Sequence, residues 1–402
     1  MTLDLERLRA AFPSLRSGIA HFDGPGGTQT PAAVGDAIAR ALTGPLSNRG
    51  HAVESESNAE TAISAFRQAY GDLLHVPADG VVYGRSATQL AYDFSRHLAK
   101  GWGAGDEVVV SRLDHDSNIR PWVQAAERAG ATVRWLPFDA ATTELDLTGL
   151  DEIITARTRL VAVTAASNLL GTMPPVREIA DRAHAVGALV YVDGVHFAAH
   201  AHVDVPALGA DLFACSPYKF LGPHCGVLAA DPALLETIRP DKLLPSTDVV
   251  PERFEFGTLP YELMAGATAA VEFLAALDPG GATERRDRLG ASKASIHQHE
   301  HALRSRLETG LAALGDRVTV HSRAAERTPT VLLSHPGRSC RDAYLFLAER
   351  GVLAPAGSFY AIEPFRALGL PDTAALRAGI APYTSEDDVD RLVDGLAAFV
   401  GA

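Results

Sequence analysis

The sequence predicts an α/β protein with a large, mostly parallel seven-stranded sheet and a smaller α+β region at its C-terminus. Between about residues 80 and 230, short apolar runs alternate with amphipathic stretches of helical period. This alternation is typical of parallel strands joined by helical crossovers. After residue 260 the helical stretches become longer and the strand-like runs become few. A chain of 402 residues is also long enough for two domains.

The expected strands of the large sheet are seven apolar runs: 81–83, 107–110, 131–136, 160–163, 188–192, 211–214 and 226–229. Amphipathic or long helical stretches are expected near 87–99, 118–129, 176–186, 261–277, 287–313, 340–350 and 385–400. Short strands of the smaller region are expected near 317–321, 329–333 and 376–381. We therefore expect an N-terminal segment (1–20) packed on the small domain, a large domain (21–260), a linking helix (261–286) and a small domain (287–402).

Composition narrows the class of protein. Apolar residues make up 47% of the chain and charged residues 21%, which is typical of a soluble globular protein. The formal net charge of −13 argues against a nucleic-acid partner. No run approaches the roughly 20 apolar residues that span a bilayer, and the acidic N-terminus lacks the apolar core of a signal peptide. We expect a cytoplasmic protein without a membrane partner.

The three cysteines are too few and too scattered to indicate a disulfide framework. Cys215 lies in an apolar run and is expected to be buried and inert. Cys225, beside His224, is not expected to be reactive. Cys340 stands at the start of a predicted helix, where the pKa of a thiol can be lowered. We nevertheless expect Cys340 to be an ordinary surface cysteine.

Asp193 and Lys219 form the most informative pair in the chain. Asp193 ends the apolar run 188–192, and Lys219 follows the next run, 211–214. A lysine amine can condense with the aldehyde of pyridoxal phosphate. An aspartate can hold the pyridine nitrogen protonated, so that the ring accepts electrons from a substrate carbanion. In this order, at the ends of successive strands, the two residues indicate pyridoxal phosphate chemistry.

Further polar residues follow other expected strands, where ligands of α/β sheets gather. The segment 84–88 joins a strand to a helix and offers backbone N–H groups to a phosphate, although Ser86 could simply cap the helix. His115 could stack its ring on the cofactor or merely cap the next helix. The Asn168 amide could bond to the phenolic oxygen of the cofactor and to a substrate carboxylate.

Two other patterns resemble known sites but are read differently. The first pattern is a histidine spacing compatible with metal ligands, at His196, His200 and His202. We expect His196 to serve the cofactor, the other two to face solvent, and no metal to bind. The segment 24–27 resembles a phosphate loop but lacks the strand–helix context, so we expect a tight turn near the mouth of the active site. A nucleotide-binding dehydrogenase is disfavoured because no G-x-G-x-x-G turn is present.

These motifs resemble the fold-type I pyridoxal-phosphate enzymes, specifically the class V aminotransferase and cysteine desulfurase group. The resemblance covers nearly the whole chain and is strongest to the cysteine desulfurase-like branch. Its residues are the segments 21–29 (HFDGPGGTQ), 112–116 (RLDHD) and 216–220 (SPYKF). The motifs are specific for the family but not for one reaction.

The resemblance implies the roles of the catalytic residues and the cofactor site. Lys219 would be the Schiff-base lysine and proton shuttle, Asp193 would pair with the pyridine nitrogen, and His115 would stack on the ring. His196 stands where the desulfurases have a glutamine near the phenolic oxygen. The positions that match the phosphate site are Ser86, Ala87, Thr88, Ser216 and Tyr218.

The resemblance also implies a substrate site and a homodimer. Arg377 matches the arginine that grips a substrate α-carboxylate. Arg49 and His51 lie in a segment similar to one lining the substrate entrance, and Tyr360 belongs to a loop expected to read the substrate side chain. Thr258 lies in a segment resembling the one that reaches the phosphate of the neighbouring subunit, which would make the active site shared.

One departure from the family pattern concerns the reaction. Desulfurases carry a nucleophilic cysteine in the loop that here reads Ala354 to Ala361, and this loop contains no cysteine. We therefore expect a pyridoxal-phosphate enzyme acting at the α-carbon of an amino acid, with C–S cleavage of cysteine or an S-substituted cysteine by β-elimination as the leading hypothesis. Transamination, epimerisation or decarboxylation of a specialised amino acid is the alternative. A non-catalytic cofactor-binding partner protein is a minor one.

Overall fold

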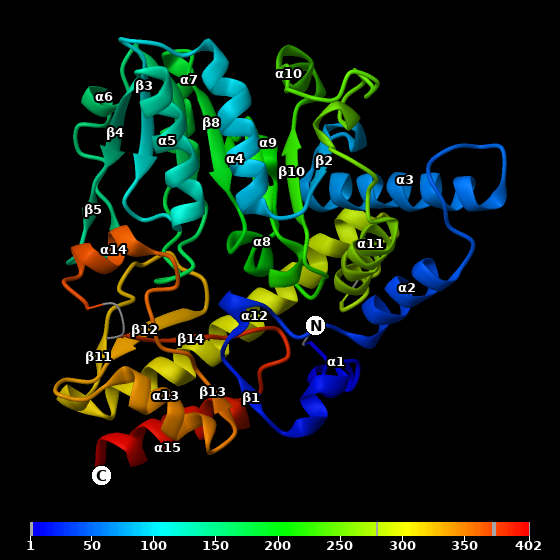
Figure 1. Ribbon diagram of the computed structural model, residues 1–402. Coiled ribbons are helices and arrows are strands. Elements are labelled where there is room, and N and C mark those ends of the chain that lie inside the picture. Colours follow the sequence, from blue (N-terminus) through cyan, green and yellow to red (C-terminus); the bar gives the residue numbers. More distant parts are fainter. Residues whose placement is uncertain (1–2, 279, 372–374, 402) are drawn as a thin grey trace.

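A seven-stranded sheet forms the centre of the protein, whose computed structural model describes residues 3–278, 280–371 and 375–401 (Figure 1). The strand order is β2-β10-β9-β8-β7-β3-β4. β10 runs antiparallel to both of its neighbours, and the other adjacent pairs are parallel. The predicted α/β architecture with a mostly parallel sheet is confirmed. The strands are β2 (Val81–Gly84), β3 (Glu107–Ser111), β4 (Thr132–Leu136), β7 (Thr158–Thr164), β8 (Leu189–Asp193), β9 (Leu212–Cys215) and β10 (Gly226–Ala230).

Helices cover both faces of this sheet, which explains why its strands read as continuous apolar runs. Successive residues of β3 alternate between the two faces: Val108 and Val110 pack into one apolar core, and Val109 packs into the other. Figure 1 shows α4 and α5 lying across the near face. The helices whose buried residues join these two cores include α3 (Glu54–Leu74), α4 (Ala87–Leu98), α5 (Arg120–Ala129), α7 (Val176–Ala185) and α11 (Tyr261–Ala275).

A smaller antiparallel sheet, in the order β11-β12-β14, has an apolar core of its own. It consists of β11 (Thr319–Val320), β12 (Thr330–Ser334) and β14 (Leu376–Gly379). The helices packed with it are α12 (Arg285–Ala312), α13 (Cys340–Ala348) and α15 (Glu386–Gly401). Near the N-terminus, β1 (Ala20–His21) pairs in parallel with β13 (Val352–Leu353), and α1 (Leu5–Ala10) is tied to α15 by an ion pair between Arg9 and Asp388 of 2.7 Å.

The remaining elements connect these layers: α2 (Ala32–Thr43), β5 (Phe138–Asp139), β6 (Glu144–Leu145), α6 (Leu150–Ile153), α8 (Phe197–His200), α9 (Val205–Leu208), α10 (Pro232–Thr237) and α14 (Ile362–Ala367). Among the described residues, no helix combines the length and the apolar character needed to cross a membrane.

The burial of one cysteine differs from the expectation. Cys340 is 1% exposed and belongs to the core of the three-stranded sheet, so the prediction of a surface cysteine is wrong. The physical reason is helical periodicity: Cys340, Ala343 and Leu347 share one face of α13, and that face is buried. Cys215 and Cys225 are also buried.

Candidate active site

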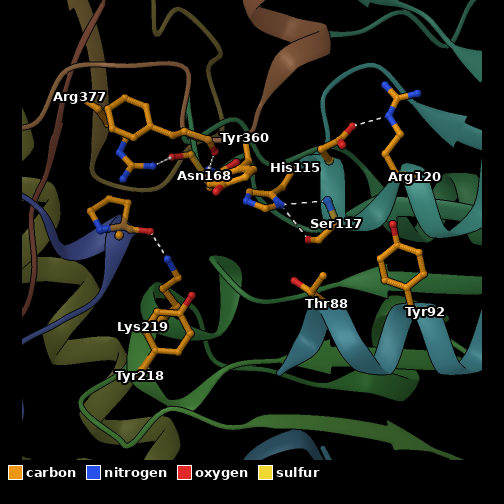
Figure 2. A pocket seen from close by; sticks show the side chains of 14 residues that line it. Thr88, Tyr92, His115, Ser117, Arg120, Asn168, Tyr218, Lys219, Tyr360 and Arg377 are labelled. Carbon is orange, nitrogen blue, oxygen red and sulfur yellow. Dashed lines mark hydrogen bonds and ion pairs between the residues drawn. The ribbon is translucent and has the colours of Figure 1, made fainter. Parts of the chain in front are cut away.

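A cleft of about 620 Å³ opens between the carboxyl ends of the parallel strands and the loops of the three-stranded sheet. Lys219, His115 and Asn168 reach it from the large sheet, and Arg377 and Tyr360 reach it from the other side (Figure 2). Each of the first three follows a strand of the large sheet, where the topology of an open α/β sheet places a ligand site. The sequence expectation that these residues gather at one edge is therefore met by the geometry.

Asp193 and Lys219 line the same inner cavity at the base of this cleft. Asp193 is the last residue of β8, and its parallel neighbour β9 leads through Ser216 into a short 3₁₀ turn, Pro217–Lys219. The parallel pairing brings the ends of both strands to one edge. The adjacency of Asp193 and Lys219 thus follows directly from the strand order.

The Lys219 amine lies in an environment that disfavours its charge. Burial, and then the positive charge of Arg377, lowers the pKa of Lys219 to about 7, although Asp193 acts in the opposite direction. The amine donates a hydrogen bond to the carbonyl oxygen of Pro25, in the 3₁₀ turn Gly24–Gly26. Burial also raises the pKa of Asp193 to about 6, while a hydrogen bond from the Val195 N–H favours its ionised form. A substantial fraction of Lys219 is therefore a neutral, nucleophilic amine near pH 7.

The His115 imidazole is neutral, and a hydrogen bond from the Ser117 backbone holds its Nδ1. Its Nδ1 lies 3.1 Å from the backbone N–H of Ser117, which can only donate, so Nδ1 is an acceptor and the proton resides on Nε2. Burial, and then the charges of Lys219 and Arg377, lowers the pKa of His115 to about 4. The ring of Tyr360 lies beside it, with centroids 5.4 Å apart. An uncharged, oriented imidazole is suited to stacking on an aromatic ring.

Arg377 projects from β14 and is a buried cation with an unused hydrogen-bonding edge. Its Nη1 donates to the backbone oxygen of Asn168 at 2.9 Å, and the Phe359 ring lies over its guanidinium carbon at 3.8 Å. Its Nε is buried and has no partner among the described residues. A side chain at Gly26 would begin 3.6 Å from Nη2, so the glycine leaves this edge open. Burial lowers the pKa of Arg377 to about 9, which leaves it charged at neutral pH.

One hydrogen bond fixes the orientation of the Asn168 side-chain amide. Its Nδ2 donates to the carbonyl oxygen of Phe359 at 3.0 Å. A carbonyl only accepts, so this bond fixes the amide orientation and leaves Oδ1, which is buried without a partner in the described part of the chain. Asn168 therefore offers the cleft an acceptor. The second Nδ2 hydrogen is still a potential donor, so the expected bonding to a phenolic oxygen or a carboxylate stays a prediction.

The N-terminus of α4 borders the inner cavity and carries a favourable partial charge for an anion. Ser86 is its N-cap and accepts from the Gln89 N–H at 3.0 Å, so the simple capping role foreseen for Ser86 is present. The other members of the expected phosphate site that line this cavity are Ala87, Thr88, Ser216 and Tyr218.

Comparison with known proteins decides the family. The profile described as Aminotransferase class-V matches residues 20–392. The chain belongs to this family. Among its relatives, an uncharacterised protein of Mycobacterium tuberculosis is 32% identical and covers 99% of this chain and 100% of its own. A probable cysteine desulfurase of Pseudomonas aeruginosa is 32% identical, with 95% of both chains covered. The solved cysteine desulfurase CsdA of Escherichia coli is 27% identical, covers 98% of both chains and superposes with a TM-score of 0.86.

Class V aminotransferases are pyridoxal-phosphate enzymes, and both the predicted family and the predicted cofactor are confirmed by the match. The residues present fit this cofactor. A half-buried amine with a lowered pKa and a carboxylate line one cavity, together with the N-terminus of α4. Two orphaned polar atoms, Asn168 Oδ1 and Arg377 Nε, lie beside the same cleft. These atoms lack partners that a polar ligand would supply.

The loop 354–361 retains its place at the cleft without the desulfurase nucleophile. Phe359 and Tyr360 line the cleft, but the loop contains no cysteine. Cys215, Cys225 and Cys340 all lie in described parts of the chain, and none of them lines the cleft. Within the described residues, no thiol is positioned to accept sulfur from a substrate in this chain.

The histidine cluster resolves into separate roles. His196 borders the inner cavity, but its Nε2 is already within 2.9 Å and 3.1 Å of the hydroxyls of Thr328 and Thr330. His200 is buried and pairs with Glu300 at 2.9 Å, so the prediction that it faces solvent is wrong. The reason is the i, i+4 spacing, which puts His200 on the same buried face as His196. His202 is exposed, as expected.

Three expected site residues lie away from the cleft of their own chain. Arg49 is engaged by Glu60 at 2.9 Å and by Glu252 at 2.7 Å, and it does not line the cleft. His51 and Thr258 are exposed. In this chain alone, the structure does not bring them to Lys219.

Sequence reasoning missed part of the cleft wall, formed by Tyr92, Ser117 and Arg120. Tyr92 lies four residues after Thr88 on α4, and this spacing puts both side chains on one face of the helix. Arg120 is likewise four residues after Asp116 and pairs with it at 2.8 Å. The i, i+4 spacing was the available signal in both cases.

Proposed function

We propose that this class V enzyme cleaves the C–S bond of cysteine or an S-substituted cysteine by β-elimination, without a cysteine nucleophile of its own. The observation that carries the proposal is the combination in one cleft: Lys219, Asp193 and Arg377 are present, and the loop 354–361 lacks a thiol. The curated relatives named cysteine desulfurases support a sulfur-containing amino acid as the substrate.

The cofactor would be held by residues of the inner cavity. Lys219 would supply the Schiff-base amine, Asp193 would face the pyridine nitrogen, and His115 would lie against the ring. The N-terminus of α4, with Ser86 as its cap, would receive the phosphate. When bound, pyridoxal phosphate supplies an electrophile for the substrate amine and an electron sink for the pair left at the α-carbon.

The residues of the chain would orient the substrate and move its proton. Arg377 would bind the α-carboxylate through its open Nε–Nη2 edge, because Nη1 is already occupied by Asn168. The Lys219 amine would accept the α-proton, and its pKa of about 7 matches that of an effective base at neutral pH. The neutral His115 would add no competing charge.

Elimination balances without an oxidant or a protein thiol. The α-C–H bond breaks and the proton goes to Lys219, while the Cβ–S bond breaks and its electron pair leaves with sulfur as a thiolate. The released enamine takes up water to give pyruvate and ammonia. Cysteine would thus yield pyruvate, ammonia and sulfide, and S-methylcysteine would yield methanethiol in place of sulfide.

We also propose a cytoplasmic homodimer with a shared active site. The exposed Thr258 and the neighbouring Phe256, which is 38% exposed, would face the partner. Leu243 and Leu244 are 71% and 98% exposed on a nearby loop, as expected for apolar side chains that a partner covers. Arg49 and His51 would then approach the cleft of the other subunit.

The test is pyruvate release from S-methyl-L-cysteine by the purified, cofactor-loaded protein. We expect steady pyruvate formation by the native chain and none by Lys219→Ala. A folded, cofactor-loaded native protein that forms no pyruvate, or a Lys219→Ala variant that still does, would reject the elimination mechanism.

A further inference from the structure

Phe359 contacts both groups that face the substrate end of the cleft. Its ring lies over the guanidinium of Arg377 at 3.8 Å, and its carbonyl oxygen accepts the Asn168 Nδ2 hydrogen bond of 3.0 Å. Asn168 in turn accepts from Arg377 Nη1 through its backbone oxygen, at 2.9 Å. The three residues, from three separate segments of the chain, close a triangle of contacts.

The backbone that carries Phe359 is held in an uncommon conformation. Phe359 and Tyr360 have φ angles of 53° and 59°, in the left-handed region that side chains with a β-carbon disfavour. Such a conformation persists when surrounding contacts over-determine it. The Tyr360 carbonyl accepts from the Asp116 N–H at 2.8 Å.

The helix that follows is anchored as well. Glu363 of α14 is 7% exposed and pairs with Arg112 at 2.5 Å and with Arg120 at 3.3 Å. Glu363 lies three residues after Tyr360, and before the strained pair the Gly357 N–H donates to the Ala375 carbonyl oxygen at 2.9 Å. The segment is thus held on both sides of the pair. The loop is therefore held against the cleft from the large-sheet side at Asp116, Asn168, Arg112 and Arg120.

We propose that Phe359 is a positioning residue that sets how Arg377 and Asn168 meet the substrate. The inference rests on the proposed function, in which Arg377 binds an α-carboxylate. The Phe359 ring covers one face of the guanidinium and Asn168 occupies Nη1, so the Nε–Nη2 edge remains for a carboxylate.

The Phe359 carbonyl has a separate consequence for specificity. Because it engages Asn168 Nδ2, this cleft-lining residue keeps Oδ1 as a buried acceptor with no partner among the described residues. The site is therefore built for a carboxylate on Arg377 and an N–H donor near Asn168, the pair of groups that an α-amino acid carries. A substrate with a second acidic group near Asn168 would meet an acceptor and be disfavoured.

Ligands that bind but do not react can measure how Phe359 affects carboxylate binding by Arg377. 2-Aminoisobutyrate has an α-amine and a carboxylate but no α-hydrogen, and tert-butylamine is a matched amine with a methyl group in place of the carboxylate and likewise no α-hydrogen. Titration of each into the cofactor-loaded protein, followed by the visible absorbance of the bound cofactor, measures the two affinities. For Phe359→Ala we expect about tenfold weaker binding of 2-aminoisobutyrate and unchanged binding of tert-butylamine.

Three further variants separate positioning from packing. Phe359→Tyr restores an aromatic face and is expected to bind 2-aminoisobutyrate like the native protein, whereas Phe359→Leu keeps bulk without an aromatic face and is expected to resemble alanine. Phe346→Ala is a matched control: the Phe346 ring also lies under an arginine, Arg350, at 3.5 Å, on α13 and outside the cleft. It should leave both affinities unchanged.

Each outcome supports or overturns the inference. Native affinity for 2-aminoisobutyrate in Phe359→Ala and Phe359→Leu, with weakened affinity in Arg377→Ala, would overturn it and leave the carboxylate site standing. Equally weakened binding of both ligands by Phe359→Ala would show that Phe359 only packs the site, and this result would also overturn the inference. Native affinity in Arg377→Ala would instead reject the carboxylate role within the proposed function. Should Phe359→Ala fail to fold, the tyrosine and leucine variants carry the comparison.

Discussion

Arg377, which is buried on β14, and Lys219, which is half-buried just after β9, line one cleft. Burial, and then the charge of Arg377, lowers the pKa of Lys219 to about 7. The same arginine remains charged, because its own pKa of about 9 stays above neutrality. Arg377, which is proposed to bind the substrate carboxylate, thus also lowers the pKa of Lys219, which is proposed to react.

The first prediction concerns the pH dependence of cofactor capture. A primary amine attacks an aldehyde only when neutral, so capture of pyridoxal phosphate by the apo-protein should rise as the pH passes through about 7, the pKa of Lys219. In Arg377→Gln the lost positive charge raises that pKa, and the rise should move to higher pH, with several-fold slower capture at pH 7. Stopped-flow absorbance of the cofactor measures this, and an unchanged midpoint would mean that Arg377 does not tune the amine.

The second prediction separates substrate binding from cofactor binding. Arg377→Ala removes the proposed partner of the α-carboxylate, so KM for S-methylcysteine should rise by about 10- to 100-fold. Retention of the cofactor on dialysis should change little, because the inner cavity is left intact. Comparable losses of both would show that Arg377 has been assigned to the wrong ligand.

The third prediction concerns the thiols. Burial raises the pKa of Cys215 well above its ordinary value, that of Cys225 to about 12, and that of Cys340 above its ordinary value. Few thiolates exist at neutral pH, so iodoacetamide should leave pyruvate formation within about twofold of the untreated rate. Rapid inactivation, with one cysteine labelled and protected by substrate, would contradict a mechanism without a thiol.

The fourth prediction tests the shared site. If the exposed Thr258 reaches the phosphate of the neighbouring subunit, Thr258→Glu should weaken cofactor binding at least about tenfold by charge repulsion. Thr237→Glu, on the exposed surface of α10, is the matched control and should bind normally. Ultrafiltration gives the dissociation constants and sedimentation velocity the assembly state. Normal binding by a Thr258→Glu dimer would remove Thr258 from the site.

The strand pattern of the large sheet was predictable because most of its strands are buried on both faces and read as continuous apolar runs, although the edge strand β4 is partly exposed. Two helices at the N-terminal end, α2 and α3, were not foreseen, since several residues of the first half of α3 are exposed and give little apolar periodicity. Cys340 and His200 were misplaced for a related reason, because each was judged by its sequence neighbours instead of by its helical face.

The core of the site, Lys219 with Asp193, was predictable from order and spacing alone. The contacts of Phe359 were not, because they join residues 168, 359 and 377, and long-range packing of a loop leaves no local signature. The orientation of the Asn168 amide depends on the same packing. Sequence could name this residue as polar and well placed, but not which of its atoms faces the cleft.

The carbon product formed from L-cysteine tests the central claim most directly. β-Elimination by Lys219, with no thiol to accept sulfur, predicts pyruvate and ammonia in equal amounts with sulfide. Transfer of sulfur to a protein thiolate would instead leave alanine and a persulfide. Quantification of both keto acid and amino acid by mass spectrometry decides between them: pyruvate as the dominant product supports the account, and stoichiometric alanine would contradict it.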